Sequence, residues 1–315
     1  MTVIKKEKKN GIDIIHVKKD KTDAEMDKIA NTLIKPASIH LIIKEDADVY
    51  TEDNKLLLKF RKNKLTQGNI KKFYDNVINF AKKSYSCNRG STSASKSKNV
   101  YENPKVFSNI IGYMDTFSPS QKVLFKQQGK SIKIVARECR FNTDYPEKYK
   151  QLVPMIQDID LLYKKMVPEH YAKQYKKAKQ THYRVPKTSF TTITTNVNFQ
   201  TSIHKDKGDD KEGFGNLTVI EEGPYTGAET CFPQYGIGVD VRTGDILFMD
   251  VHEWHANLPM VKKDKDTIRL SIVCYLRYNV WKNTRKISKQ KLMQHNKTVK
   301  GLRKAWKLVG KRESL

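Results

Sequence analysis

The stretch Phe190-Thr-Thr-Ile-Thr-Thr-Asn-Val-Asn-Phe199 decides the fold, because from here the sequence takes on the composition of a β-protein. Thr, Ile and Val suit the pleated, half-buried surface of a sheet. Gly- and Pro-containing turns separate the segments that follow. Short strands at this spacing are typical of a sandwich or barrel, so we predict an α+β protein with a double-stranded β-helix (jelly-roll) core. Its further strands are expected at Asn216–Glu221, Ala228–Phe232, Gly238–Val241, Ile246–Asp250 and Arg269–Tyr278.

Two helical regions precede these strands. Asn69–Lys83 has apolar residues three or four positions apart, which gives one apolar helix face. Tyr145–Lys177 repeats this spacing and is expected to break near Pro154 and Pro168. Ile132–Val135, between the two regions, is predicted to be a strand. We expect the helices to buttress the sheet.

Composition divides the chain into three expected regions. Residues 67–281 contain the helices and strands described above and are expected to form the main domain. Residues 282–315 form a basic C-terminal helical tail with 12 Lys or Arg and one acidic residue. The tail either lies along a phosphate backbone, which we favour, or is a solvated helix that closes the fold. Residues 1–66 are predicted to be a small mixed α/β unit, with strands at Gly11–Val17, Ser38–Ile43 and Lys55–Phe60 and a helix at Ala24–Ile34.

The charge of the chain predicts an anionic partner. Lys and Arg number 60 against 34 Asp and Glu, a net charge of +26. A general lysine bias would also raise the charge, but the excess is uneven along the chain, which favours nucleic acid. No apolar run approaches the roughly 18 residues that span a bilayer, so no membrane is expected. The four cysteines are far apart and form no C-x-x-C pair, which fits a reducing, intracellular compartment.

Two short motifs predict a metal site. In His204-Lys-Asp206 the two side chains are two positions apart, so in an extended segment they point to the same side. Two histidines and one carboxylate are the ligands of a non-heme Fe(II) with open positions. The second histidine must come from a distant strand. His252 and His255 both follow the predicted strand that ends at Asp250, and spacing alone leaves both open.

Arg269 begins an apolar strand, Arg-Leu-Ser-Ile-Val-Cys-Tyr275. An arginine that points into the core needs an anion, and a guanidinium binds a carboxylate through two hydrogen bonds. The distal carboxylate of 2-oxoglutarate is such an anion, and Ser271 faces the same way. The alternative is an ordinary edge-strand arginine paired with an aspartate. The metal motif favours the first interpretation.

These residues resemble the TET/JBP family of Fe(II)/2-oxoglutarate-dependent nucleic-acid-modifying dioxygenases. The resemblance is nearer to the J-binding-protein branch, which hydroxylates thymine, than to the animal TET branch. It covers about a quarter of the chain strongly. The matching pieces are Asn198-Phe-Gln-Thr-Ser-Ile-His-Lys-Asp206, Gly227-Ala-Glu-Thr-Cys-Phe-Pro-Gln-Tyr235, Gly244-Asp-Ile-Leu-Phe248, Asp250-Val-His-Glu-Trp-His-Ala-Asn257 and Thr267-Ile-Arg-Leu-Ser-Ile-Val-Cys-Tyr275.

The resemblance implies a role for each motif. His204, Asp206 and His255 would ligate Fe(II), while Arg269 with Ser271 would hold 2-oxoglutarate. Oxidative decarboxylation with O₂ would give succinate, CO₂ and an Fe(IV)-oxo group, which hydroxylates the methyl group of thymine or 5-methylcytosine in DNA. Two alternatives remain open: the same chemistry on RNA or protein, or an inactive basic protein that binds nucleic acid. Asp250 and Glu253 receive no catalytic role.

A DNA substrate would place the protein in the nucleus, or in the cytoplasm of a prokaryotic or virus-infected cell. The target nucleotide must be flipped out or unpaired. Candidate nucleic-acid contacts are Arg89, Lys282, Arg285 and Lys286. Candidate stacking residues, each more readily explained as core, are Tyr113, Phe117, Tyr183 and Phe199.

Overall fold

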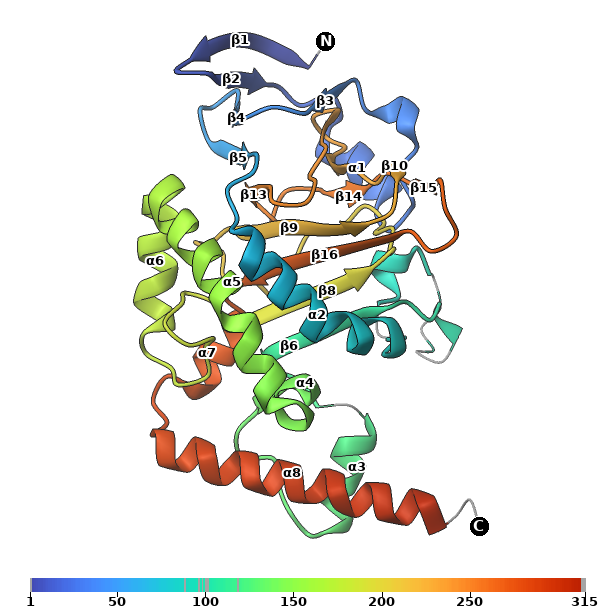
Figure 1. Cartoon of the computed structure of the whole chain (residues 1–315), viewed down its shortest axis with the longest axis vertical. Helices are drawn as coiled ribbons and strands as arrows, with labels where there is room; N and C mark the ends of the chain where they lie inside the picture. Colours follow the sequence, from blue (N-terminus) through green and yellow to red (C-terminus); the bar gives the residue numbers. More distant parts are fainter. Residues whose placement is uncertain are drawn as a thin grey trace.

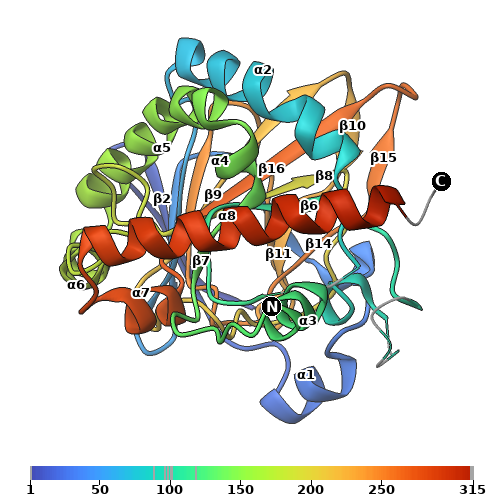
Figure 2. The ribbon, with the colours of Figure 1, turned by 90° about the horizontal axis from the view of Figure 1, so that it is seen from below.

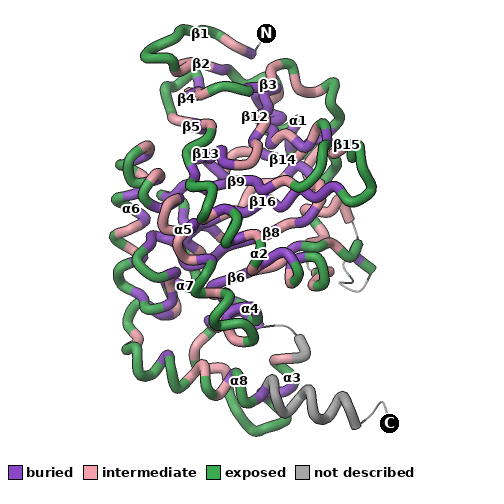
Figure 3. The backbone as a smooth tube through the Cα atoms, viewed as in Figure 1, coloured by how far each residue is buried: buried purple, intermediate pink, exposed green. Residues whose placement is uncertain are grey.

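The computed structural model describes residues 2–87, 89–95, 97, 99, 102–117 and 119–312, with the backbone alone at 119, 120 and 303–312. The described chain forms a mixed α/β fold in layers (Figure 1). Two β-sheets face each other, and helices cover the outer face of the larger sheet. Buried residues follow the central strands, and the helices expose their outer faces (Figure 3).

The larger sheet joins strands from both ends of the chain. Most neighbours in it are antiparallel, whereas β2 (Ile12–Val17) and β4 (Ala47–Thr51) are parallel. The order runs from β1 at one edge to β7 at the other, so four of the strands within residues 1–66 extend the main sheet. The complete order is β1 (Val3–Lys9), β2, β4, β5 (Leu56–Arg61), β13 (Ile246–Met249), β9 (Gly215–Glu222), β16 (Ile268–Tyr275), β8 (Thr192–Val197), β6 (Ser108–Met114) and β7 (Arg137–Glu138).

A smaller sheet packs on the inner face of the larger one. Its Phe232, Ile237 and Val239 are fully buried against Val219 and Leu247 of the larger sheet. Burial of such side chains stabilises the fold by about 1.5–3 kcal/mol each. The strand order is β14 (Ala256–Asn257), β11 (Thr230–Phe232), β12 (Ile237–Val239) and β3 (Leu41–Ile43), and β10 (Tyr225–Gly227) pairs separately with β15 (Met260–Lys262).

Most of the helices lie on the outer face of the larger sheet and below it, whereas α1 (Asp23–Ile29) lies beside the smaller sheet, where Met26 packs with Cys231 and Ala256 (Figure 1). Two long helices, α2 (Gln67–Lys83) and α5 (Pro146–Met166), pack through Phe73, Val77 and Ile156 against that sheet. The expected helix break at Pro154 is wrong, because α5 continues through this proline. Pro154 removes one backbone donor, and the buried residues on either side hold the helix. The others are α3 (Pro119–Gln127), α4 (Arg140–Asp144), α6 (Pro168–Ala178), α7 (Tyr278–Thr284) and α8 (Lys289–Arg312).

The region before α4 differs from expectation. Ile132–Val135 is not a strand, and β7 follows two residues later as a short partner of β6. The apolar side chains of Ile132 and Ile134 pack in the clusters beneath α8 instead of in a sheet. The alternating apolar residues Ile132 and Ile134 therefore mark a partly buried segment that does not pair as a strand.

The last helix, α8, crosses the lower end of the molecule, beside α3 (Figure 2). Its apolar residues Leu292, Val299 and Leu302 are buried, and the last two pack with Phe117 and Leu124. The preceding helix, α7, crosses the expected border between residues 281 and 282. In the described part of the chain, no helix combines the length and the apolar composition that crossing a membrane requires.

Candidate metal centre

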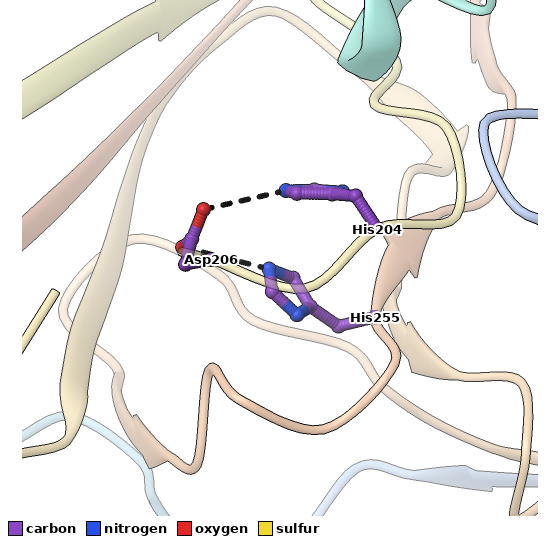
Figure 4. Close-up of side chains that lie close together, drawn as sticks. All are labelled: His204, Asp206 and His255. Atoms are coloured by element: carbon purple, nitrogen blue, oxygen red, sulfur yellow. Dashed lines mark ion pairs between the residues drawn. The ribbon is translucent and has the colours of Figure 1, made fainter. Parts of the chain in front are cut away.

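Three side chains converge at one end of the two facing sheets. Nε2 of His204 lies 3.8 Å from one carboxylate oxygen of Asp206, and Nε2 of His255 lies 3.8 Å from the other (Figure 4). One candidate ligand atom from each residue lies within 4.8 Å of the other two. The sequence predicted this convergence of residues about 50 positions apart, and the structure brings all three together.

Backbone pairing sets this geometry. His204 and His255 form an isolated antiparallel bridge, with N–H to O=C distances of 3.0 and 2.9 Å in the two directions. The amide of Asp206 donates to the carbonyl of Val251 at 2.9 Å. Segments 204–206 and 251–255 thus run side by side, so the ligand atoms come together without a long connecting side chain.

Hydrogen bonds also fix the imidazole tautomers. Nδ1 of His204 donates to the carbonyl of Ser202 at 2.7 Å, and Nδ1 of His255 donates to the carbonyl of Glu253 at 2.9 Å. Each Nε2 is left as a lone-pair donor that faces Asp206. Burial and the neighbouring His255 lower the pKa of His204 to about 4, so its ring is neutral at physiological pH. Neutral imidazoles held through the second nitrogen are the usual state of metal-binding histidines.

His252 occupies a different place from His255. Its Nδ1 lies 3.1 Å from the carbonyl oxygen of Asp206, and its Nε2 lies 3.3 Å from that of Asp210. His252 therefore contacts the backbone of the loop that contains Asp206. His252 thus positions this loop, and the metal-binding group consists of His204, Asp206 and His255 without it.

The three residues line a cavity of about 120 Å³. Alternate residues of β16 form one wall, among them Ser271, Val273 and Tyr275, because successive side chains of a strand point to opposite faces. The amide of Asn196 donates to the hydroxyl of Ser271 at 3.3 Å. Leu217, Met249, Val251 and Val273 add apolar surface, which limits the access of water to the triad.

Arg269 lies beyond this cavity, two residues before Ser271 on β16. It is 5% exposed, and its Nε and Nη2 atoms find no hydrogen-bond partner among the described residues. Arg269 lines an adjoining cavity of about 210 Å³, and Phe199 and Asn257 line both cavities. A buried guanidinium without a protein partner requires an anion. The donors present therefore fit a dicarboxylate whose far end reaches Arg269.

Sequence reasoning missed a buried ionic cluster opposite the triad. Arg277 lines the metal cavity, and its Nε donates to the Asp115 carboxylate at 2.6 Å. Asp209 lines the same cavity, where burial and the nearby Asp206 raise its pKa well above the ordinary value. Arg277 continues the alternation of β16, a signal present in the sequence, whereas neither aspartate had a distinguishing pattern.

The four predicted nucleic-acid contacts separate into two groups. Arg89 lines the metal cavity. Lys282, Arg285 and Lys286 are exposed on and after α7 and do not line that cavity. The guanidinium of Arg285 lies 4.7 Å from the ring centroid of Trp281.

The stacking candidates also separate. Tyr113 and Tyr183 stack on each other with ring centroids 4.4 Å apart, and Phe117 is buried in the cluster beneath α8. Phe199 alone among the four lines the metal cavity.

Asp250 and Glu253, to which the sequence assigned no catalytic role, pair with a lysine outside the triad. The ammonium group of Lys55 lies 2.6 Å from the Asp250 carboxylate and 3.3 Å from that of Glu253. The Asp250 carboxylate also accepts the amide of His252 at 3.0 Å. Both acids thus brace the turn before His255.

Comparison with known proteins agrees with this geometry. Residues 120–278, about half of the chain, match the Tet_JBP family, described as the oxygenase domain of the 2OGFeDO superfamily. This match confirms the predicted dependence on Fe(II), 2-oxoglutarate and O₂ at the level of the family. The structure of NgTET1 in complex with 5mC DNA aligns with a TM-score of 0.52 and 12% identity over 88% of this chain and 100% of that one. The two chains share a fold.

Curated relatives include thymine dioxygenase JBP1 of Trypanosoma brucei brucei, 30% identical over 54% of this chain and 19% of the relative. The bifunctional helicase and thymine dioxygenase JBP2 of Leishmania tarentolae is 32% identical over 49% of this chain and 14% of the relative. The chain thus spans about a fifth or less of their length. The family match covers half of the chain and includes His204, Asp206 and His255, which could hold a metal ion. The chain therefore belongs to the Tet_JBP family of oxygenase domains.

Proposed function

We propose that this protein is an Fe(II)- and 2-oxoglutarate-dependent dioxygenase that hydroxylates the methyl group of a DNA base, thymine or 5-methylcytosine. The convergence of His204, Asp206 and His255, with an adjoining cavity lined by the buried Arg269 whose Nε and Nη2 have no partner among the described residues, carries this proposal. The thymine dioxygenase function of JBP1 and JBP2 supports thymine, and the DNA bound to NgTET1 supports a DNA substrate. The net charge of +26 is consistent with both.

In this proposal the chain's residues bind, orient and shield. Nε2 of His204, Nε2 of His255 and the Asp206 carboxylate would hold the iron. Arg269 binds the distal carboxylate of 2-oxoglutarate, and Ser271 adds a hydroxyl on the same face of β16. The apolar side chains of the cavity exclude water from the reacting methyl group. The bound iron and 2-oxoglutarate supply the oxidising chemistry, with succinate and CO₂ as co-products.

We also propose that the two facing sheets form a double-stranded β-helix. In support, the chain alternates between them: β8 and β9 lie in the larger sheet, β11 and β12 in the smaller, β13 in the larger, β14 in the smaller and β16 in the larger. This alternation places the loop after β8 and the segment before β14 at the same end. Those are the two segments that carry the triad.

The test is the base composition of DNA after incubation with the protein, iron, 2-oxoglutarate and air. Nucleoside mass spectrometry should detect a hydroxymethylated base, and omission of 2-oxoglutarate should abolish it. Asp206→Ala should remove turnover, whereas Asp264→Ala, an exposed acid on the β15–β16 loop, should not. Absence of product from DNA containing thymine and from DNA containing 5-methylcytosine would refute the proposal, and parallel RNA and peptide substrates would show whether another polymer is the target.

A further inference from the structure

A second, larger cavity lies beyond the edge of the larger sheet. Its volume is about 760 Å³, and its walls come from α2, β6 and the start of α4 and α5. We call it the edge groove. This volume falls in the range of about 300–1,000 Å³ that is typical of sites for ligands of a few hundred daltons. The family comparison assigns nothing to the edge groove, and among its lining residues the sequence singled out Arg89 as a candidate nucleic-acid contact.

The edge groove is strongly basic. Lys83, Arg89, Arg137, Arg140 and Lys148 line it, and no Asp or Glu is among its described lining residues. Arg140 pairs with Asp144 at 3.4 Å, whereas the described residues place no carboxylate within ion-pair distance of the other four. A concave surface of one charge sign attracts a polyanion.

Aromatic rings alternate with these cations. Tyr85 and Tyr145 line the edge groove and are 55% and 39% exposed, and the ammonium group of Lys105 lies 5.1 Å from the ring centroid of Tyr85. The ammonium group of Lys148 lies 5.7 Å from the ring centroid of Tyr145, and the guanidinium of Arg140 lies 5.9 Å from that of Phe80. Cations beside stacking platforms are the combination that binds single-stranded nucleic acid without base pairing.

Two structural links join the edge groove to the metal cavity. Arg89 lines both cavities. At the end of β6, Met114 and Thr116 line the groove, while Asp115 between them pairs with Arg277 of the metal cavity. The two cavities therefore adjoin at Arg89 and at the end of β6.

We propose that the edge groove binds unpaired nucleotides next to the target nucleotide, so that the protein prefers single-stranded nucleic acid to duplex. This inference rests on the proposed function, because the metal cavity supplies the target position. A duplex hides its base faces and could use the cations alone. An acidic peptide would use the cations but lacks flat bases for Tyr85 and Tyr145, and a membrane surface would not enter a concave groove.

Binding of a fluorescent single-stranded 12-mer and of its duplex to the full chain tests the inference by anisotropy. The wild type should bind the single strand more tightly. Lys83→Ala/Lys148→Ala should weaken this binding about 10-fold or more and reduce the slope of log affinity against log salt by about 1.4. Lys72→Ala/Lys165→Ala removes the same charge from exposed positions on the same two helices outside the groove and should change affinity little.

The aromatic part is tested separately. Tyr85→Leu should weaken single-strand binding about 5-fold or more and leave duplex binding nearly unchanged, because stacking needs an unpaired base. Tyr278→Leu, at a ring that is 38% exposed on α7, is the matched control. Circular dichroism and the melting temperature verify that each variant is folded. Equal loss for single strand and duplex, no loss for either, or equally effective competition by poly-glutamate would overturn the inference.

Turnover separates this inference from the proposed function. A wild type that forms no hydroxylated base, yet binds the single strand through Lys83, Lys148 and Tyr85, would refute the function and retain the groove. A wild type that forms product, with groove variants whose KM for single-stranded substrate is unchanged, would retain the function and refute the groove.

Discussion

At the scale of single residues, Arg269 is the side chain whose surroundings demand a ligand. Its guanidinium is buried, and two of its nitrogens lack a protein partner among the described residues. An uncompensated buried charge destabilises the folded state by several kcal/mol. Without a ligand, the folded protein is therefore destabilised by this unpaired charge, and a bound dicarboxylate would remove the destabilisation.

This predicts opposite effects of Arg269→Met on stability and on binding. Without 2-oxoglutarate the variant should melt at the same or a higher temperature than the wild type, because the unpaired charge is gone. With 2-oxoglutarate at about 100 times its Kd, the wild type should gain about 2.7 kcal/mol of stability and the variant almost nothing. Calorimetry with and without 2-oxoglutarate measures both effects, and an equal gain in the two proteins would contradict the role of Arg269.

Arg277 illustrates a buried charge that already has partners. It pairs with Asp115 and lies beside Asp209, so its removal leaves the buried Asp115 carboxylate without its cation. We expect Arg277→Met to lower the free energy of unfolding by about 3 kcal/mol. Adding Asp115→Asn should recover part of this loss in urea denaturation. A double variant as unstable as the sum of both single variants would show that the two side chains are not coupled.

At the scale of elements, α8 has a structural role. The sequence suggested that this basic tail follows a phosphate backbone. In the structure, three apolar residues of α8 are buried against the rest of the protein: Leu292, Val299 and Leu302. Deleting residues 282–315 would expose these clusters as well as remove charge. Loss of DNA binding after such a truncation would therefore not by itself identify a nucleic-acid contact.

Point substitutions on α8 separate the two roles. Leu302→Ala should lower the free energy of unfolding by about 2–4 kcal/mol, because it leaves a cavity beside Phe117 and Phe125. Met293→Ala, at a side chain that is 54% exposed on the same helix, should change it by less than about 0.5 kcal/mol. Urea denaturation measures both, and equal effects would mean that α8 is not packed as described.

The docking of α8 should also depend on pH. Nε2 of His295 donates to the carbonyl of Ala136 at 2.7 Å, and burial lowers the pKa of this histidine below 6.5. Between the unfolded and the folded pKa, the unfolded chain binds more protons, so stability falls as the pH drops below about 6.5. His295→Gln keeps a donor and should remove this part of the acid sensitivity. A melting temperature with the same slope between pH 7 and 5 in both proteins would contradict it.

At the scale of the whole molecule, the strands within residues 1–66 belong to the same two sheets as the rest of the chain, four to the larger sheet and β3 to the smaller. Leu247 of β13 pairs with Phe60 of β5, and the buried Arg61 guanidinium pairs with Asp48 at 2.7 Å. We expect a single cooperative unfolding transition for the full chain, and a chain that lacks residues 1–66 should not fold. Two separated transitions in urea, or a folded shortened chain, would show that residues 1–66 form an independent unit.

The sequence predicted the parts of the molecule that depend on local pattern. The longer strands from Thr192 onward, the two long helices and the His204/Asp206 pair follow from alternation, helical spacing and short motifs, whereas His255 was chosen over His252 by the family resemblance and the short strands β10, β14 and β15 were not predicted. It could not predict which sheet receives β3 or β5, because pairing with β12 and β13 depends on contacts far along the chain. Asp115 and Asp209 were missed for the same reason: only the folded chain brings them to Arg277.

The two histidines of the metal centre are oriented by main-chain carbonyl oxygens of residues two positions earlier, 202 and 253. Every amino acid has such an oxygen, so the orientation places no demand on which side chain occupies either position. Substitutions of the side chain at residue 253 are thus expected to leave iron binding unchanged. Glu253→Gln should still bind the metal, although it weakens the contact with Lys55.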